Sequence, residues 1–133
     1  MEKKILLIED SPTQAMSIKF ELERLGYTIS IAHDGYKGLE LVNTYQPAVI
    51  VLDLNLPNID GIEVCRRLKQ PGQAEWIRSI PVLMFSAQGR LSNMSDAYKA
   101  GADHYVTKDR EGAGFLTKVL DATFRRIERR RSA

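Results

Sequence analysis

Side chains that could carry chemistry follow four apolar runs of the sequence, each at the point where the run stops. Glu9 and Asp10 follow the first run, Asp53 the second, Ser86 the third and Lys108 the last. Each has a simpler explanation when taken alone, because aspartate and serine cap helices and lysine is usually solvated. Their shared placement at the ends of separate apolar runs points instead to a single site.

These residue types would form a cation site if the runs are strands of one parallel sheet. The carboxyl ends of such strands share an edge, and ligands bind at that edge in open α/β sheets. Three carboxylates brought together there repel one another unless a cation lies among them. Their hard oxygen atoms favour Mg²⁺, which binds one or two carboxylates together with phosphate oxygens.

The same groups suit phosphoryl transfer. A metal ion and the Lys108 ammonium would offset charge on the transferring oxygens, while the Asp53 carboxylate attacks in line. The product would be an aspartyl phosphate, a known covalent form of a carboxylate nucleophile. His33 and His104 stand apart from these residues and from each other in the sequence, so we expect no zinc site.

The hydrophobic pattern predicts the elements that must position these residues. Apolar runs, or alternation in one case, predict five strands over residues 5–8, 28–32, 48–52, 81–85 and 104–107, the second of them at a sheet edge. Helical spacing predicts five helices, over about 12–25, 35–45, 62–69, 91–100 and from about 115 onward. The chain is therefore expected to form a doubly wound, flavodoxin-like α/β fold, a (βα)5 unit whose five-stranded parallel sheet has the order 2-1-3-4-5.

Local signals predict further details. Ser11 is a predicted N-cap, and Gln14 is expected to complete a capping box with it. Leu25 is expected on the buried face of the first helix. The segment before the fourth strand is expected to be a loop from which Trp76 and Ile77 fold back over the core.

Length and composition are typical of one globular domain spanning residues 1–133. Hydrophobic residues make up 44% of the chain and charged residues 27%. No apolar run approaches the roughly 18 residues that cross a bilayer, so no membrane association is expected. The single cysteine, Cys65, excludes an internal disulfide and favours a cytoplasmic location.

Charge is uneven along the chain. The formal net charge is +2, whereas the end of the last helix, at about 124–133, carries five arginines and one glutamate. Without a global basic field we do not expect nucleic-acid binding. We interpret the basic end first as a solvated helix terminus, where cations complement the helix dipole. A docking or dimer surface, or the start of a linker to an output domain, stays open as an alternative.

Further motifs accompany the site residues. They are Pro57 and Gly61 after the run VLDLNLP that contains Asp53, Ala87 after Ser86, the triplet Gly101-Ala102-Asp103, and Tyr105 three residues before Lys108. With Glu9-Asp10, these motifs resemble the receiver domain of two-component response regulators over essentially the whole chain, in a stand-alone or single-domain form. The resemblance implies a phosphoacceptor module of a phosphorelay that catalyses only its own phosphorylation and dephosphorylation.

The resemblance also implies how the phosphoacceptor and the metal are held. Asp53 would accept a phosphoryl group from a histidine kinase or a histidine phosphotransfer protein. Asp10 and Asp53 would bind Mg²⁺ directly. Glu9 would hold the ion through water, and Asn55 would contribute its backbone carbonyl.

The remaining roles concern the attached phosphoryl group. Lys108 would pair with it, and Ser86 would hydrogen-bond to it. Tyr105 would swing inward as Ser86 moves, which would alter the face made by the fourth helix, fifth strand and fifth helix. A downstream protein or a second copy would bind that face. Asn55 and Gln88 would tune how fast the phosphate is lost.

One residue departs from the family pattern, because Asp109 stands where proline usually follows the lysine. A cis bond to a residue other than proline costs about 3–4 kcal/mol. The Lys108–Asp109 peptide would therefore be cis at that cost, or trans with Lys108 reaching the site differently. If Asp109 disables phosphorylation, the receiver would act as a constitutive protein-binding module.

Two other classes remain as alternatives. A Mg²⁺-dependent phosphatase with an aspartate nucleophile has an Asp-x-Asp pair after its first strand, whereas here Asp53 follows the third strand and Asn55 replaces the second aspartate. A flavodoxin needs a phosphate-binding Ser/Thr/Gly loop after the first strand, where Glu9 and Asp10 would repel phosphate.

Overall fold

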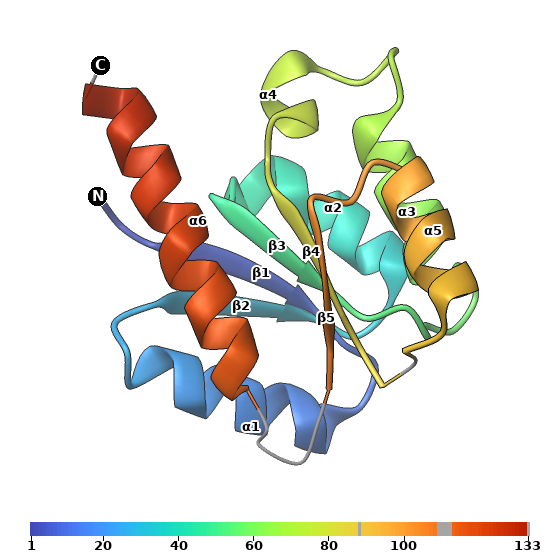
Figure 1. Ribbon diagram of the computed structural model, residues 1–133, viewed down its shortest axis with the longest axis horizontal. Helices are drawn as coiled ribbons and strands as arrows, with labels where there is room; N and C mark the ends of the chain where they lie inside the picture. The colour runs from blue at the N-terminus through green and yellow to red at the C-terminus, as the bar shows by residue number, and fades with distance from the viewer. Residues whose placement is uncertain (88, 109–112, 133) are drawn as a thin grey trace.

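A five-stranded parallel sheet forms the centre of the computed structural model, which describes residues 1–87, 89–108 and 113–132 (Figure 1). The elements in chain order are β1 (Lys4–Ile8), α1 (Pro12–Glu23), β2 (Thr28–Ala32), α2 (Gly35–Tyr45), β3 (Val49–Leu52), α3 (Gly61–Lys69), α4 (Glu75–Arg78), β4 (Val82–Ser86), α5 (Leu91–Lys99), β5 (His104–Thr107) and α6 (Gly114–Ser132). The strand order is β2-β1-β3-β4-β5, and every neighbouring pair is parallel. The predicted flavodoxin-like topology is therefore confirmed.

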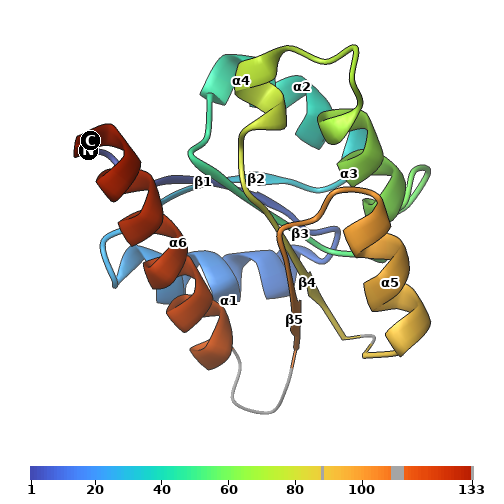
Figure 2. The ribbon, with the colours of Figure 1, turned by 45° about the horizontal axis from the view of Figure 1, so that its top comes forward.

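Helices cover both faces of the sheet and create two separate cores. α2, α3 and α5 lie on one face of the sheet, and α1 and α6 lie on the other (Figure 2). Leu6 and Ile8 of β1 pack with residues of the first group, whereas Ile5 and Leu7 pack with residues of the second. Successive side chains of a strand point to opposite faces, so a strand covered on both sides is apolar at every position. This explains the continuous apolar run at the start of the chain.

The first helix begins as predicted but uses a different set of hydrogen bonds. The Ser11 hydroxyl accepts a hydrogen bond from the Gln14 backbone N–H at 3.2 Å, as an N-cap does. The capping box is wrong in its second half, because the Gln14 side chain accepts from Lys108 instead. The Ser11 N–H donates to the Glu9 carboxylate at 3.1 Å, so a site residue completes the cap.

The end of α1 differs from the sequence expectation. The helix ends at Glu23, and Gly26 adopts a φ of +95°, which turns the chain away from the helix. Leu25 follows the helix and is 58% exposed, so its expected place on the buried face was wrong.

The segment before β4 is not a plain loop, because it contains the short helix α4. Ile77 on this helix is 4% exposed and covers the core as expected. Trp76 is 46% exposed, so its expected burial was wrong. Neighbouring residues of a helix point about 100° apart, and a single turn can bury only one of them.

The longest helix, α6, has 19 residues and ends in Arg129, Arg130 and Arg131. Leu116 and Leu120 on its inner side are fully buried. In the described ranges, no helix combines the length and apolar character needed to cross a membrane.

Gly61 closes the loop that follows Asp53, and we expect its replacement to be costly. Its N–H donates to the Leu54 carbonyl at 2.9 Å. A Cβ atom there would lie 2.2 Å from the Asp53 carbonyl oxygen and 2.9 Å from the Leu54 Cα. Because both contacts are backbone, Gly61→Ala should lower the free energy of unfolding by about 2–3 kcal/mol in urea denaturation.

Gly72 provides the matched control for this prediction. A Cβ at Gly72 would meet nothing within 4 Å, so Gly72→Ala should change the free energy of unfolding by less than about 0.5 kcal/mol. Equal stability of the two variants would contradict the close approach at Gly61.

Candidate functional site

The carboxyl ends of four strands bring the predicted site residues to one edge of the sheet. Glu9 follows β1, Asp53 follows β3, Ser86 ends β4 and Lys108 follows β5. Backbone hydrogen bonds extend this alignment beyond the strands, since the Asp53 N–H donates to the Ile8 carbonyl at 3.0 Å and the Lys108 N–H to the Ser86 carbonyl at 2.7 Å. The convergence expected from the parallel topology is thus observed.

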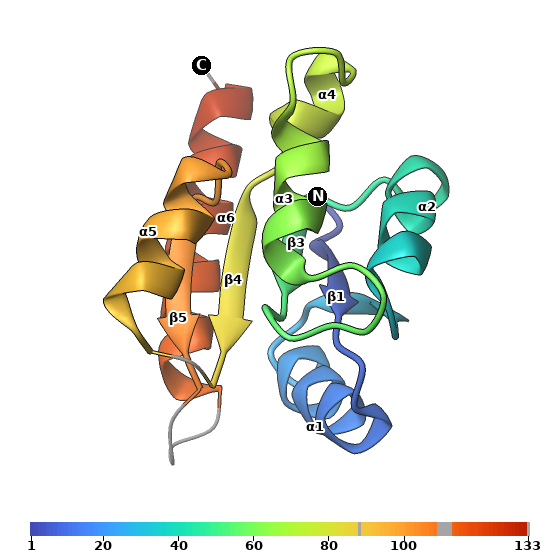
Figure 3. The ribbon, with the colours of Figure 1, turned by 90° about the vertical axis from the view of Figure 1, so that its right-hand side faces the viewer.

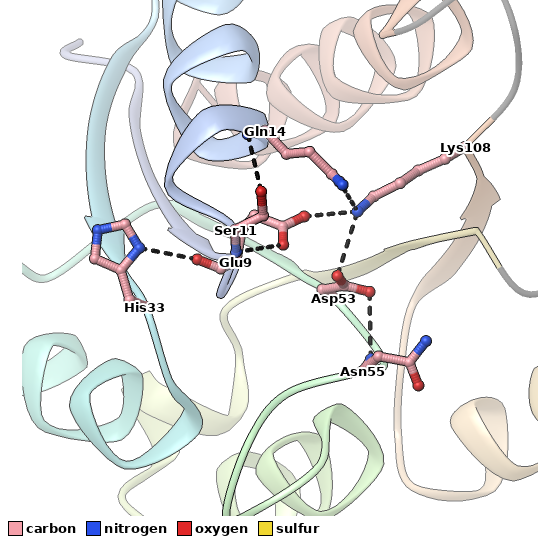
Figure 4. A network of polar contacts seen from close by, with 7 residues as sticks. All are labelled: Glu9, Ser11, Gln14, His33, Asp53, Asn55 and Lys108. Atoms are coloured by element: carbon pink, nitrogen blue, oxygen red, sulfur yellow. Dashed lines mark hydrogen bonds and ion pairs between the residues drawn. The ribbon is translucent and has the colours of Figure 1, made fainter.

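Lys108 is the centre of the polar network (Figure 4). Its ammonium nitrogen lies 2.6 Å from Glu9 Oε1 and 3.2 Å from Asp53 Oδ2. It also donates to Gln14 Oε1 at 3.0 Å. The Lys108 side chain is 18% exposed, and those of Glu9 and Asp53 are 2% and 10% exposed. Charge-assisted hydrogen bonds with so little solvent are among the stronger polar contacts in proteins.

Three carboxylates form a cluster that suits a divalent cation. Glu9, Asp10 and Asp53 each offer an oxygen atom within 4.8 Å of the others. Glu9 and Asp53 are buried while Asp10 is exposed, so the cluster opens to solvent at one side. With Lys108 the formal charge of the ionised group is −2, which a divalent cation would balance. The all-oxygen donor set therefore fits Mg²⁺.

Backbone donors orient the two buried carboxylates. Glu9 Oε2 accepts from the Ser11 N–H at 3.1 Å, and Asp53 Oδ1 accepts from the Asn55 N–H at 3.3 Å (Figure 4). The Glu9 carbonyl lies 3.1 Å from Nδ1 of His33. Glu9 and Asp53 thus share one pattern of contacts, in which one oxygen accepts a backbone N–H and the other faces the Lys108 ammonium.

Ser86 and Tyr105 lie against each other beside the acidic cluster. Ser86 is fully buried. Burial raises the pKa of the Tyr105 phenol, and the Asp53 carboxylate raises it further, while a side-chain hydrogen bond with Ser86 acts in the opposite direction. The Tyr105 backbone N–H, on the edge strand β5, donates to the Tyr98 hydroxyl at 3.1 Å. Hydrogen bonds therefore connect Ser86 to α5 through Tyr105 and Tyr98, and the Asp53 carboxylate acts on Tyr105 electrostatically.

Gln14 contacts the site through Lys108, a role that sequence reasoning missed. Its only sequence signal was the capping box, and a lysine partner 94 positions away cannot be inferred from that pattern. The ammonium has no acceptor capacity, so the contact must use the amide oxygen of Gln14. Lys108 also lies over the Phe85 ring, 5.5 Å from its centroid. Gln14 and Phe85 therefore contact Lys108 in addition to the two carboxylates.

We expect Gln14→Leu to slow phosphoryl uptake from a small donor about three- to tenfold, because Lys108 loses one of its fixed acceptors. Gln14→Glu, which keeps an oxygen acceptor, should stay within about twofold of the unmodified chain. Thr13→Ala, in the same exposed first turn of α1, is the matched control. A Gln14→Leu rate equal to that of Thr13→Ala would contradict the positioning role.

Two predicted residues fall outside the described part of the chain. Gln88, expected to tune phosphate loss, and Asp109, expected to affect the peptide bond after Lys108, both lie outside the described residues. Asn55 is described and exposed, and its side chain lies beside Asp53 at the rim of the site (Figure 4).

The fold and the acidic cluster define an α/β protein suited to phosphoryl transfer onto a carboxylate. The family model described as response regulator receiver domain matches residues 5–120, and the chain therefore belongs to the receiver-domain family. It is a phosphoacceptor domain of two-component signalling, which catalyses only its own phosphorylation and dephosphorylation. This family assignment excludes the phosphatase and flavodoxin alternatives.

Curated relatives are similar to nearly the whole chain. It is 39% identical over 126 residues to the DNA-binding dual master transcriptional regulator RpaA of Synechocystis sp., covering 95% of this chain and 51% of that protein. It is 35% identical over 130 residues to the alkaline phosphatase synthesis transcriptional regulatory protein PhoP of Bacillus subtilis, covering 98% of this chain and 50% of the relative. The chain thus spans about half the length of the curated relatives it matches.

Solved receiver structures share the fold. The receiver domain of the Francisella response regulator 1452 has a TM-score of 0.83 at 28% identity, covering 95% of this chain and 99% of that one. The receiver domain of sensor histidine kinase PA1611 from Pseudomonas aeruginosa PAO1 has a TM-score of 0.80 at 25% identity, covering 92% and 97%. That structure has a magnesium ion coordinated in its active site cleft.

Proposed function

We propose that Asp53 is the residue that accepts the phosphoryl group. The observation that carries this assignment is the position of its carboxylate within the acidic cluster, 3.2 Å from the Lys108 ammonium. Asp53 is 8% exposed, so a small opening would admit a donor while limiting water. The Asn55 N–H donates to Oδ1 of Asp53, so Oδ2 is the oxygen that attacks phosphorus in this proposal.

The donor is a phosphohistidine of a histidine kinase or a histidine phosphotransfer protein. An Asp53 oxygen forms the new bond to phosphorus as the phosphorus–nitrogen bond breaks, and the imidazole leaves with the electron pair. Lys108 pairs with the phosphoryl oxygens, and the Ser86 hydroxyl donates to one of them. Bound Mg²⁺ would offset negative charge on those oxygens.

Asp10 and Asp53 are the proposed direct ligands of Mg²⁺, together with the Asn55 backbone carbonyl. Glu9 acts through water in this proposal. This division follows the family resemblance, because Glu9 and Asp53 each pair one oxygen with Lys108 and accept a backbone N–H at the other. We place this receiver, a single domain over residues 1–133, in the cytoplasm, where such donors act.

Tyr105 and Ser86 form the proposed switch. Attachment of a dianionic phosphoryl group would draw the Ser86 hydroxyl toward Asp53, and Tyr105 would follow into the space beside it. The change would reach the face made by α5, β5 and α6, which correspond to the fourth helix, fifth strand and fifth helix of the family because α4 is an additional short turn. A downstream protein, or a second copy of the chain, binds this face in the proposal.

We expect Tyr105→Phe to separate phosphorylation from its readout. The variant keeps the ring but loses the hydrogen bond with Ser86. Phosphoryl uptake should stay within about twofold of the unmodified chain, since no group that contacts phosphorus is removed. The amide NMR shifts that phosphorylation produces in α5 should fall below about half, because roughly 1 kcal/mol of hydrogen-bond coupling is lost.

Tyr36→Phe is the control for this variant, because Tyr36 is 51% exposed on α2. Unchanged shifts in α5 in the Tyr105→Phe protein would refute the switch.

The test of the proposed function is the intact mass of the chain after incubation with acetyl phosphate and Mg²⁺. We expect a gain of one phosphoryl group that is lost in acid or base and does not appear when a chelator is present. No gain in a folded protein would refute it and favour the constitutive binding module that Asp109 suggests.

A further inference from the structure

A groove of about 480 Å³ lies at the end of the sheet opposite the acidic cluster. Its walls come from the N-terminal segment, the connections that precede β3 and β4, α4, and the last turns of α6. In Figure 1 the N-terminus, α4 and the C-terminal end of α6 lie on the side of the molecule where β1 and β4 begin, and Figure 3 shows α4 and the end of α6 at one end. The groove is therefore separated from Asp53 by the length of the strands.

One wall of the groove is apolar and contains a large exposed aromatic ring. This ring belongs to Trp76, the single tryptophan of the sequence, which is 46% exposed. Pro47 and Pro81 also line the groove, as does Ile127, which lies on α6 with two arginines of the lining. Ile77 anchors α4 in the core at 4% exposure, which fixes the helix while its neighbour stays accessible. A fixed, accessible tryptophan is a typical energetic centre of a protein interface.

The basic part of the lining comes mainly from α6, through Arg130 and Arg131. In the part of the chain that the structure describes, neither of these two side chains forms an ion pair or hydrogen bond, whereas the Arg125 side chain of the same helix pairs with Asp121 at 3.1 Å. Lys4 also lines the groove, but its ammonium lies over the Tyr45 ring, 4.6 Å from the centroid.

The charge of the lining determines what kind of ligand fits. Among the described residues that line the groove, Glu2 is the one acidic residue, against Lys4, Arg130 and Arg131. The lining therefore carries a formal charge of +2. A ligand that complements this lining needs carboxylates for the guanidinium groups and an apolar side chain for Trp76.

We propose that this groove binds an acidic peptide segment of a partner protein. Carboxylates of the segment pair with Arg130 and Arg131, and one apolar side chain of the segment packs on Trp76. Arginine presents a planar fork of donors that matches a carboxylate.

The observations favour a peptide over a nucleic acid or a membrane. Nucleic-acid affinity depends on many phosphate contacts spread along a surface, and anionic bilayers are bound by clusters of about 4–8 cations. Here only two guanidinium groups line the concave site, on consecutive residues of α6. Arg125 and Arg129 line a different surface, with Glu128 and Ser132. At about 100° per residue they point to the opposite side of α6 from Arg130 and Arg131.

The test uses Trp76 as the probe. The full chain is titrated with a short synthetic peptide of Asp and Glu residues around one central Leu, and tryptophan emission is recorded. Comparison ligands are the same peptide with Ser in place of Leu, duplex DNA, and vesicles that contain phosphatidylserine. We expect a saturable blue shift with the Leu peptide and at least about tenfold weaker binding of the Ser peptide, since one buried apolar side chain is lost.

Two double variants then locate the binding. Arg130→Ala with Arg131→Ala should weaken the Leu peptide about tenfold, because two charge-assisted contacts are removed. Arg125→Ala with Arg129→Ala, which removes the same charge from the opposite side of α6, should change binding less than about twofold. Both pairs are exposed, so circular dichroism should show an unchanged fold.

Each other outcome overturns the proposal. Equal weakening by the two double variants would mean that only the net charge of α6 matters. Tighter binding of DNA or vesicles with the same dependence on Arg130 and Arg131 would assign the groove to that ligand, and no change of emission with any ligand would leave it without one. Because no phosphoryl donor is present, the result is independent of the role of Asp53.

Discussion

Asp53→Ala should take up no detectable phosphoryl group from acetyl phosphate, a loss of at least about 10³-fold in rate. The substitution removes a buried carboxylate that lies 3.2 Å from the Lys108 ammonium and accepts a hydrogen bond from the Asn55 N–H. The fold should persist, because Lys108 keeps its pair with Glu9 at 2.6 Å and one of three repelling carboxylates is gone. Intact mass with and without Mg²⁺ measures the loss.

Asp10→Asn is the matched control for this variant. It removes one charge from the same cluster but leaves the proposed nucleophile in place. We expect it to become phosphorylated, with the Mg²⁺ concentration for half-maximal rate raised at least about tenfold. Phosphoryl uptake by Asp53→Ala at the rate of Asp10→Asn would contradict the assignment of the acceptor.

Lys108→Ala should slow phosphoryl uptake about 10²-fold, the effect of removing one fixed donor aimed at developing charge. Its binding of Mg²⁺ should be at least as tight as that of the unmodified chain. The reason is that the Lys108 ammonium forms ion pairs with carboxylate oxygens of Glu9 and Asp53, two members of the acidic cluster, and competes there with a metal ion. Metal-free Lys108→Ala should also be less stable, and added Mg²⁺ should recover part of that stability.

The rate from intact mass and the metal affinity from calorimetry check the two parts of this prediction. Lys37→Ala is the control, since Lys37 pairs with Glu40 at the surface and its side chain is 59% exposed. A Lys108→Ala rate within about threefold of that control would show that Lys108 takes no part in the chemistry. That result is expected if Asp109 prevents Lys108 from reaching the phosphoryl group.

The sheet could be predicted because each of its strands is a local signal and the parallel topology restricts the connections. The strand residues from Ile5 to Ile8 are buried on both faces of the sheet, so their continuous apolar run is enough to predict a buried strand. Leu25 and Trp76 were misplaced for a different reason. Their burial depends on where a helix stops and on which side of a single turn faces the core, and tertiary packing decides both.

The candidate site was predictable to the extent that topology brings strand ends together. Glu9, Asp53 and Lys108 meet because β1, β3 and β5 are parallel strands of one sheet. The contact between Lys108 and Gln14 was not predictable, because it depends on the side-chain conformations of two long, flexible residues. Periodicity places a residue on a face but does not specify the atom that its side chain reaches.

The most direct measurement of the central claim is the position of the phosphoryl group itself. A variant can lose uptake indirectly, whereas borohydride reduces an aspartyl phosphate to homoserine and so marks the acceptor in the unmodified chain. After phosphorylation, reduction and proteolysis, peptide sequencing by mass spectrometry should find homoserine at residue 53 and nowhere else. Homoserine at residue 10, a reduced glutamate at residue 9, or an unreduced phosphate on Ser86 or a histidine would contradict the account.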